Sequence, residues 1–338
     1  MVKKTALILG LFLLVAATVL IVSVYRYLYQ PLSFTSTIEY SLKPGTSMRR
    51  LAGQLQEKKI IDCPLYFEWY ARITGLDQKI QAGEYTLQPG LSAVEILALM
   101  HRGEVRQYSF TVIEGWTFKQ LRAALANAEA IEHRLPADAG DAEVMTILGY
   151  AGQHPEGRFY PDTYLFPRGM SDIDFLKRAY KEMAVILERE WQQRDSGLPL
   201  KSKYEALILA SIVERESALA EERPLIASVF VNRLKKGMRL QTDPTVIYGM
   251  GDDYDGDIRF RDLRRDTPYN TYTRSGLPPT PIAMPSAAAI HASLHPTESS
   301  VLYFVAKGKP DGSHHFSETL SEHNAAVDRY QRKRKPIK

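Results

Sequence analysis

The first thirty residues carry the strongest apolar pattern in the chain. Two lysines, Lys3 and Lys4, precede an uncharged run from Thr5 to Val24, and tyrosines and an arginine follow it. At about 1.5 Å per residue the run spans roughly 30 Å, the thickness of a bilayer's hydrocarbon core. A cleaved secretory signal, the alternative, usually has a shorter apolar region, so we interpret the run as an uncleaved single-pass anchor. The lysines favour a cytoplasmic N-terminus, which predicts that the remaining chain lies outside the cytoplasmic (inner) membrane, on the periplasmic or extracytoplasmic side.

The next hundred residues repeat one pattern three times. Alternating strand-type residues lead to a tight turn, then to a Ser or Thr at a helix N-cap position and apolar residues at helical spacing. Three unevenly spaced copies are too few for a solenoid, so they predict small packed α+β units. The copies are Ile38–Leu51, Gly83–Leu97 and Tyr108–Leu121.

The first copy continues into a second amphipathic helix near Pro64–Ile73, before the strand at Glu84–Leu87. Strand, helix, helix and strand within about fifty residues resemble a LysM module, a small domain that binds glycan chains. The resemblance rests mainly on the stretch P-G-T-S-x-x-x-L-A from Pro44 to Ala52. A plain strand–turn–helix unit without a ligand is the alternative.

The remaining two thirds of the chain predict a larger domain. A helical pattern runs from Asp172 to Arg194 and ends at a Gly and Pro stop signal, and a new helix begins near Ser202. After Gly237 the sequence becomes short strands and loops, which often line a binding cleft. We therefore predict an α+β protein with an anchor in residues 1–30, a LysM-like module in 31–105 and a mixed α+β domain in 106–338.

Composition and motifs argue against several kinds of site and partner. The 338 residues are 45% apolar and 24% charged, with a formal net charge of +4 and one cysteine, Cys63. A single cysteine excludes an internal disulfide framework and a cysteine-type zinc site. Because no basic block is interleaved with aromatic residues, nucleic acid is not predicted as a partner. The acidic turn at 252–257 departs from EF-hand spacing, and HExxH, Walker A and GxGxxG motifs are absent, so we predict no metal and no cofactor.

The segment Tyr204–Ala220 is the best candidate for chemistry. It is apolar or small on every side from Ala206 to Val213, which predicts a buried helix. At 100° per residue, Glu214 falls on the same face as Ser211, whereas Glu216 points to the opposite side. Burial disfavours a charged carboxyl, and a general acid must hold its proton near neutral pH. The alternative is that Glu214 only pairs with a nearby arginine: Arg215, Arg223 or Arg233.

Three further stretches join this helix in a longer pattern. They are Glu156–Phe166 (E-G-R-F-Y-P-D-T-Y-L-F), Ser228–Gly251 (S-V-F-V-N-R-L-K-K-G-M-R-L-Q-T-D-P-T-V-I-Y-G-M-G) and Thr267–Pro279 (T-P-Y-N-T-Y-T-R-S-G-L-P-P). With I-V-E-R-E at 212–216, and Y-F-V-A-x-G at 303–308 followed by H-F at 315–316, they resemble the endolytic murein transglycosylase family of the YceG type. The resemblance covers nearly the whole chain, including the anchor and the LysM-like module.

This resemblance implies a lyase that cuts nascent peptidoglycan strands internally, between N-acetylmuramic acid and N-acetylglucosamine. No water is consumed, a 1,6-anhydro-N-acetylmuramoyl end remains, and glycan strand length is limited during cell-wall synthesis. The family's catalytic glutamate maps to Glu214, which makes residues 106–338 the catalytic domain. The resemblance also implies peptidoglycan glycan strands as substrate and an association with peptidoglycan synthases, the penicillin-binding proteins.

Polar residues of the matched segments are candidates for substrate contact, because their side chains can stack on a sugar or form hydrogen bonds with it. Several also occur in good turn-forming sequences, which would explain them without a ligand. The predicted substrate-binding residues are Ser211, Gln241, Thr242, Asp243, Tyr248, Asn270 and Tyr272.

Two other functions remain open from the sequence. A muramidase would use water, with Asp243 or Glu216 as the second carboxylate that hydrolysis of a glycosidic bond requires. A glycan-binding scaffold would use the anchor and the LysM-like module, with Glu214 only structural.

Overall fold

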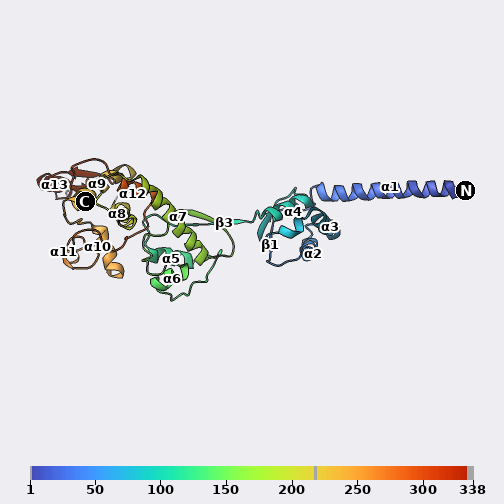
Figure 1. The fold of residues 1–338 in the computed structure, drawn as a ribbon, viewed down its shortest axis with the longest axis horizontal. Helices are drawn as coiled ribbons and strands as arrows, with labels where there is room; N and C mark the ends of the chain where they lie inside the picture. The colour runs from blue at the N-terminus through green and yellow to red at the C-terminus, as the bar shows by residue number, and fades with distance from the viewer. Residues whose placement is uncertain (1, 217–218, 333–338) are drawn as a thin grey trace, which may run out of the picture. The chain divides into compact units, whose positions relative to one another are not determined.

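The computed structural model describes residues 2–216 and 219–332 of the chain, drawn as a ribbon in Figure 1. By their internal contacts the residues divide into two compact units. Unit 1 runs up to Tyr108 and includes Leu165–Gly169, and unit 2 comprises Ser109–Tyr164 and the chain from Met170 onward. The mixed α+β class predicted from the sequence is confirmed.

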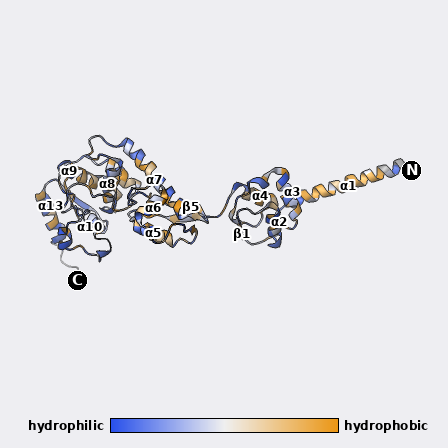
Figure 2. Cartoon of the chain, turned by 60° about the horizontal axis from the view of Figure 1, so that its bottom comes forward, coloured by the Kyte–Doolittle hydropathy of each residue, from blue (hydrophilic) through white to orange (hydrophobic). Residues whose placement is uncertain are grey.

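The N-terminal apolar run forms α1 (Val2–Tyr29), a single helix that contains the whole predicted anchor. Leu7–Tyr29 is long and apolar enough to cross a membrane, and its side chains are exposed, with Phe12 at 67%. Figure 2 shows the helix as hydrophobic along almost its entire length. Its C-terminal end packs against the rest of unit 1: Val24 contacts the core, Leu28 is buried, and the Tyr27 hydroxyl accepts a hydrogen bond from the Cys63 N–H at 3.3 Å.

Unit 1 confirms the predicted order of strand, helix, helix and strand. Two antiparallel strands pair from Ile38 opposite Leu87 to Leu42 opposite Gly83, and their buried side chains pack against the helices. Ser47 caps one helix and Ser92 caps another through a capping box, as the repeated pattern predicts. The elements are β1 (Ile38–Leu42), α2 (Met48–Glu57), α3 (Pro64–Thr74), η1 (Leu76–Lys79), β2 (Gly83–Leu87) and α4 (Ala93–Arg102).

Unit 2 is mainly helical. Its first helix is α5 (Phe118–Ala126), which Thr117 caps as the third copy of the pattern predicts. The further helices are α6 (Asp141–Leu148), α7 (Asp172–Gln193), α8 (Lys203–Glu216), η2 (Ala220–Glu222), α9 (Arg223–Lys235), α10 (Asp243–Met250), η3 (Gly251–Asp253), α11 (Phe260–Arg264), α12 (Ala287–Leu294), α13 (Leu320–Val327) and the π-helical turn η4 (Asp328–Arg332).

The other strands form two-stranded pairs. β3 (Gln107–Thr111) pairs with β5 (Thr163–Pro167), β4 (Ile131–Glu132) is parallel to β6 (Met170–Ser171), and β7 (Tyr303–Ala306) is antiparallel to β8 (His314–Ser317). The strand-like pattern at Met238–Leu240 does not form a strand. Thr242 precedes α10 instead, and Pro244 in its first turn suits a helix start because proline lacks the N–H that would be unpaired there.

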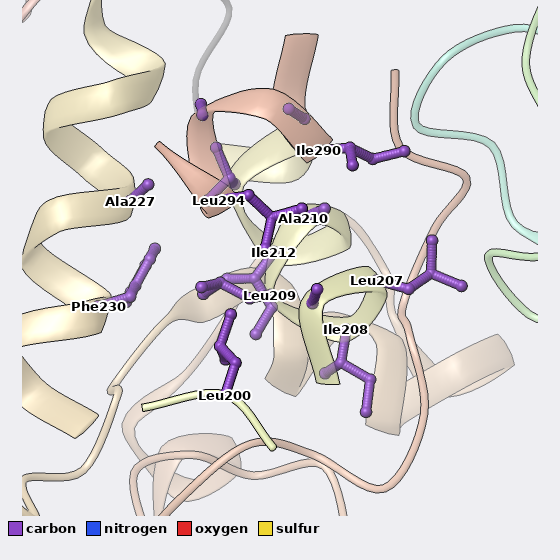
Figure 3. Packing of buried hydrophobic residues seen from close by; sticks show 14 of the residues in the cluster. Leu200, Leu207, Ile208, Leu209, Ala210, Ile212, Ala227, Phe230, Ile290 and Leu294 are labelled. Carbon is purple, nitrogen blue, oxygen red and sulfur yellow. The ribbon is translucent and has the colours of Figure 1, made fainter. Parts of the chain in front are cut away.

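The core of unit 2 is built around α8. All residues from Ala206 to Val213 are buried, as the all-round apolar pattern predicts. Leu209 and Ile212 of α8 belong to one buried cluster with Phe230 of α9 and Leu294 of α12, and Figure 3 labels all four. This packing fixes the helix on several sides, so the polar residues at its C-terminal end are held in defined directions.

Candidate active site

Glu214 lies at the C-terminal end of α8, where the buried helix emerges from the core. Its side chain is only 6% exposed. One carboxylate oxygen, Oε2, accepts hydrogen bonds from the Ser286 N–H at 2.9 Å and from the Ser286 hydroxyl at 2.5 Å. The other oxygen, Oε1, accepts one from Arg223 Nη2 at 3.2 Å. Three donors thus hold the carboxylate in one orientation.

Ser286 is the N-cap residue of α12, and this position explains why its N–H and hydroxyl can both donate hydrogen bonds to Glu214. Its hydroxyl accepts a hydrogen bond from the Ala289 N–H, which fixes the serine at the start of the helix. The N-terminus of a helix carries partial positive charge, so it favours a carboxylate next to it. Glu214 is therefore held by the first turn of α12.

Arg223, the first residue of α9, is the charged partner of Glu214. Its side chain is 12% exposed, and its Nη1 also donates to the Ser286 hydroxyl at 3.3 Å. Its Nε is buried and has no hydrogen-bond acceptor among the described residues. A buried donor without an acceptor costs about 1–3 kcal/mol. The pairing of Glu214 with an arginine, left open from the sequence, occurs with Arg223.

A second carboxyl, Glu114, faces the same group and was not singled out from the sequence. It lies in the turn before α5, where a Cβ atom on Gly115 would sit 4.0 Å from Glu214 Cγ. The turn is held in place because the Gly115 N–H donates to the Met284 carbonyl at 2.8 Å, while Arg215 Nη1 donates to the Gly115 carbonyl. Burial and the negative charge of Glu214 raise the pKa of Glu114, although Arg223 opposes this. The Glu-Gly turn of the third repeated copy was the available signal.

A large cleft adjoins this end of α8. It has a volume of about 800 Å³, and Tyr248, Tyr254 and Tyr269 contribute to its lining. The rings of Tyr248 and Tyr269 meet edge to face with their centroids 4.8 Å apart. Arg215, the neighbour of Glu214, also lines it, so we call this space the tyrosine cleft. Aromatic faces beside polar groups are suited to stacking on sugar rings.

Glu216 faces a different cavity, as the helical geometry predicts. Its carboxylate accepts a hydrogen bond from the Thr242 hydroxyl, and burial raises its pKa to about 7 against that hydrogen bond. The cavity, of about 520 Å³, also includes Gln241, Asp243 and Tyr272 in its lining. The Tyr272 hydroxyl donates to Asp243 Oδ1 at 2.6 Å. We call this the Glu216 cavity.

Comparison with known proteins places the chain among its relatives. The model of the YceG-like family matches residues 40–329. The chain belongs to the YceG-like family.

Two relatives carry the same name, endolytic murein transglycosylase. The one from Bacillus subtilis (strain 168) is 32% identical over 312 residues, which are 87% of this chain and 85% of the relative. The one from Streptococcus pneumoniae serotype 2 (strain D39 / NCTC 7466) is 27% identical over 320 residues, and the match covers 86% of this chain and 58% of that longer protein. A crystal structure of a YceG-like protein from Listeria monocytogenes matches with a TM-score of 0.53 and 30% identity, covering 86% of this chain and 99% of that one.

The predicted substrate-binding residues of this YceG-like chain do not gather at one place. Gln241, Thr242, Asp243 and Tyr272 surround the Glu216 cavity, whereas Tyr248 lies in the tyrosine cleft. The residue of α8 that lines the first cavity is Glu216, and the one that lines the tyrosine cleft is Arg215. Sequence proximity could not separate them, since Asp243 and Tyr248 lie on the same short helix.

Ser211 and Asn270 form hydrogen bonds inside the fold instead of facing a cavity. The buried Ser211 hydroxyl donates to the Ile208 carbonyl at 2.7 Å and accepts from the Ile282 N–H at 3.0 Å. The Asn270 amide is 1% exposed and donates to the Asp262, Leu263 and Arg265 carbonyls. Ser211 thus holds the segment before Ser286, and Asn270 organises its own loop. Direct substrate contact by either residue stays a prediction.

Glu156 also lines the tyrosine cleft, and the raised pKa of its carboxyl can be tested. Burial raises its pKa to about 7, against hydrogen bonds from the Tyr248 hydroxyl and the Phe118 N–H. The folded chain then keeps a proton that the unfolded chain loses, so wild-type stability falls as the pH rises from about 4.5 to about 7.

We expect Glu156→Gln to remove this contribution. The difference in free energy of unfolding between variant and wild type should then move in favour of the variant by on the order of 2 kcal/mol between about pH 4.5 and pH 8. Denaturant unfolding across this range measures it. Parallel pH dependences for the two proteins would contradict a raised pKa at Glu156.

Proposed function

We propose that this chain is a membrane-anchored lytic transglycosylase that cuts nascent peptidoglycan strands internally, between N-acetylmuramic acid and N-acetylglucosamine. The cut leaves a 1,6-anhydro-N-acetylmuramoyl end and limits glycan strand length during cell-wall synthesis. The observation that carries the proposal is the site itself: one glutamate is fixed by a serine and an arginine, and its neighbour Arg215 lines a cleft of about 800 Å³ with tyrosines in its lining.

A peptidoglycan transglycosylase activity is supported by the family and by the relatives. The Bacillus subtilis relative matches most of both chains at 32% identity, and its name states that activity. The finer statements, which are the bond cleaved, the anhydro end and the role of Glu214, rest on the site's chemistry and on the resemblance of the I-V-E-R-E motif.

Lytic cleavage needs only one carboxyl for proton transfer. Glu214 gives its proton to the glycosidic oxygen as the bond to C1 breaks, and the C6 hydroxyl of the same muramoyl residue forms the new bond to C1. The resulting carboxylate then accepts the proton of that hydroxyl, so the site returns to its starting state without water. Hydrolysis would need a second group to activate water or attack the sugar. The predicted partner for it, Glu216, instead accepts from Thr242 in another cavity.

Arg223 and Glu114 are charged side chains that interact with Glu214. One guanidinium faces two carboxylates, so one negative charge is uncompensated until a proton binds. Like charges close together favour the protonated form of one of them. Burial and the charge of Glu214 raise the pKa of Glu114, so Glu114 can hold a proton beside Glu214.

Three other parts of the chain bind the glycan strand or hold the active site near the membrane. The tyrosine cleft holds the glycan strand by stacking, and residues 31–105 bind the same polymer as a LysM-like module. Helix α1 anchors the chain in the cytoplasmic membrane with its N-terminus inside, so residues 106–338 face newly made strands. An association with peptidoglycan synthases remains a prediction from the resemblance.

Removal of the anchor gives a direct prediction. We expect a chain without residues 1–30 to leave the membrane fraction and become soluble, while it still cleaves isolated glycan strands. Fractionation of cells, followed by N-terminal sequencing of the full chain, measures this. A mature full-length protein that begins after the apolar run would show that the run is a cleaved signal instead.

The distribution of strand lengths tests the function. Purified full chain in detergent, mixed with isolated glycan strands, should convert long strands into fragments of intermediate length before small ones accumulate. Unchanged strand lengths together with retained glycan binding would favour the scaffold. Early release of disaccharides alone would contradict internal cleavage.

A further inference from the structure

One group of side chains outside the candidate active site has the composition of a metal centre. Glu190 of α7 and His291 and His295 of α12 each offer one ligand atom, and these atoms all lie within 4.8 Å of one another. The two histidines are four residues apart at the end of one helix, so their rings lie on the same side, with centroids 4.4 Å apart. We propose that this Glu190–His291–His295 cluster binds a divalent transition metal ion of the Zn²⁺ type.

The free nitrogen of His295 is the strongest observation. Its Nδ1 lies 3.0 Å from Asp195 Oδ1, and its Nε2 is buried with no hydrogen-bond partner among the described residues. When Nδ1–H donates to the aspartate, Nε2 carries a lone pair and no proton. Metal-binding histidines usually have this arrangement, with a carboxylate fixing the ring through the other nitrogen.

The carboxylate of Glu190 is likewise held in position by a neighbouring side chain. Its side chain is 9% exposed, and Arg189 donates to Oε1 at 3.0 Å through Nη2. The other oxygen, Oε2, lies 2.8 Å from His291 Nδ1. This contact is a hydrogen bond. Ligand atoms that share one Zn²⁺ at about 2.0–2.1 Å are roughly 3.3 Å apart in a tetrahedral site, so a small outward movement of the two side chains would let the ion replace this hydrogen bond.

Two imidazoles and one carboxylate are ligands that suit Zn²⁺ and related ions, and they do not suit Mg²⁺, which prefers oxygen donors. Three protein ligands leave one position for water. His291, whose side chain is 60% exposed, provides access from solvent. The ion would connect the C-terminal end of α12 to α7, while the other end of α12 holds Glu214 through Ser286. Glu190 lies about a hundred residues before the two histidines, which explains why the sequence around His291 and His295 alone did not predict a metal site.

Metal titration of the full chain tests this proposal. Untagged protein in detergent, treated with a chelator and then dialysed, is titrated with Zn²⁺ by calorimetry and with Co²⁺ by visible absorption. We expect one ion per chain, a Co²⁺ spectrum typical of nitrogen and oxygen ligands, a higher Tm with Zn²⁺ and no binding of Mg²⁺.

Variants locate the ion. His291→Ala removes an exposed ligand without opening the core, and Glu190→Gln keeps the shape of the buried one. Each should weaken Zn²⁺ binding by at least about tenfold. His133→Ala, which removes an exposed histidine elsewhere in unit 2, should leave binding unchanged. Equal affinities of wild type, His291→Ala and Glu190→Gln, or no binding by wild type, would overturn the proposal. Because the readout is binding, its failure would leave the proposed transglycosylase function unaffected.

Discussion

The Glu214→Gln variant is expected to lose cleavage of glycan strands by about 10²- to 10⁴-fold, the usual contribution of a general acid. Glutamine has the shape of glutamate but no proton to give to the leaving oxygen. It can still accept from Arg223, so the packing of α8 against α12 should persist. Rates on isolated strands, with thermal unfolding and glycan binding measured on the same samples, check this expectation.

Glu216→Gln is the matched control for that experiment. It changes the same residue type two positions later on α8, and its side chain faces the Glu216 cavity. Cleavage should remain within about tenfold of wild type, less than the loss expected from removing an acid. A large loss in Glu216→Gln together with retained activity in Glu214→Gln would move the chemistry to the Glu216 cavity. Loss of cooperative unfolding in Glu214→Gln would instead indicate a structural role for that glutamate.

The Glu114→Gln variant is expected to change the pH dependence of cleavage. Burial and the charge of Glu214 raise the pKa of Glu114, and Gln in its place removes this titrating carboxyl from beside Glu214. The alkaline limb of the rate profile should therefore leave its wild-type position. Cleavage rates on isolated glycan strands, measured across the pH range for both proteins, check this expectation.

Glu114→Asp keeps the charge and should restore most of the wild-type profile. A merely structural role for the turn around Gly115 would lower the rate by the same factor at every pH, with no movement of the limb. That outcome would contradict the charge coupling of Glu114 with Glu214, but it would leave the role of Glu214 itself to be judged by its own variant.

Local patterns in this sequence predict local structure well. The three strand–turn–helix copies form as predicted, with Ser47, Ser92 and Thr117 as N-caps, because capping and periodicity act over a few residues. The buried helix and the opposite directions of Glu214 and Glu216 also follow from the helical repeat alone.

The surroundings of Glu214 could not be predicted in the same way. Ser286 lies 72 residues after it along the chain, and Glu114 lies about a hundred residues before it. Only tertiary packing brings these segments together, and a serine or glutamate in a loop carries no local sign of its partner. Asn270 is a different case, because its surroundings rich in Tyr and Thr predict a sugar contact, while the structure shows hydrogen bonds from its amide within its own loop.

The most direct measurement of the central claim is the mass of the new chain ends formed by wild-type protein in water enriched in ¹⁸O. A lytic cut by Glu214 uses the C6 hydroxyl, so the new muramoyl ends should be one water lighter than reducing ends and contain no ¹⁸O. New reducing ends that carry ¹⁸O would show that water attacks the sugar, and the account of a single proton-transferring glutamate would then be wrong.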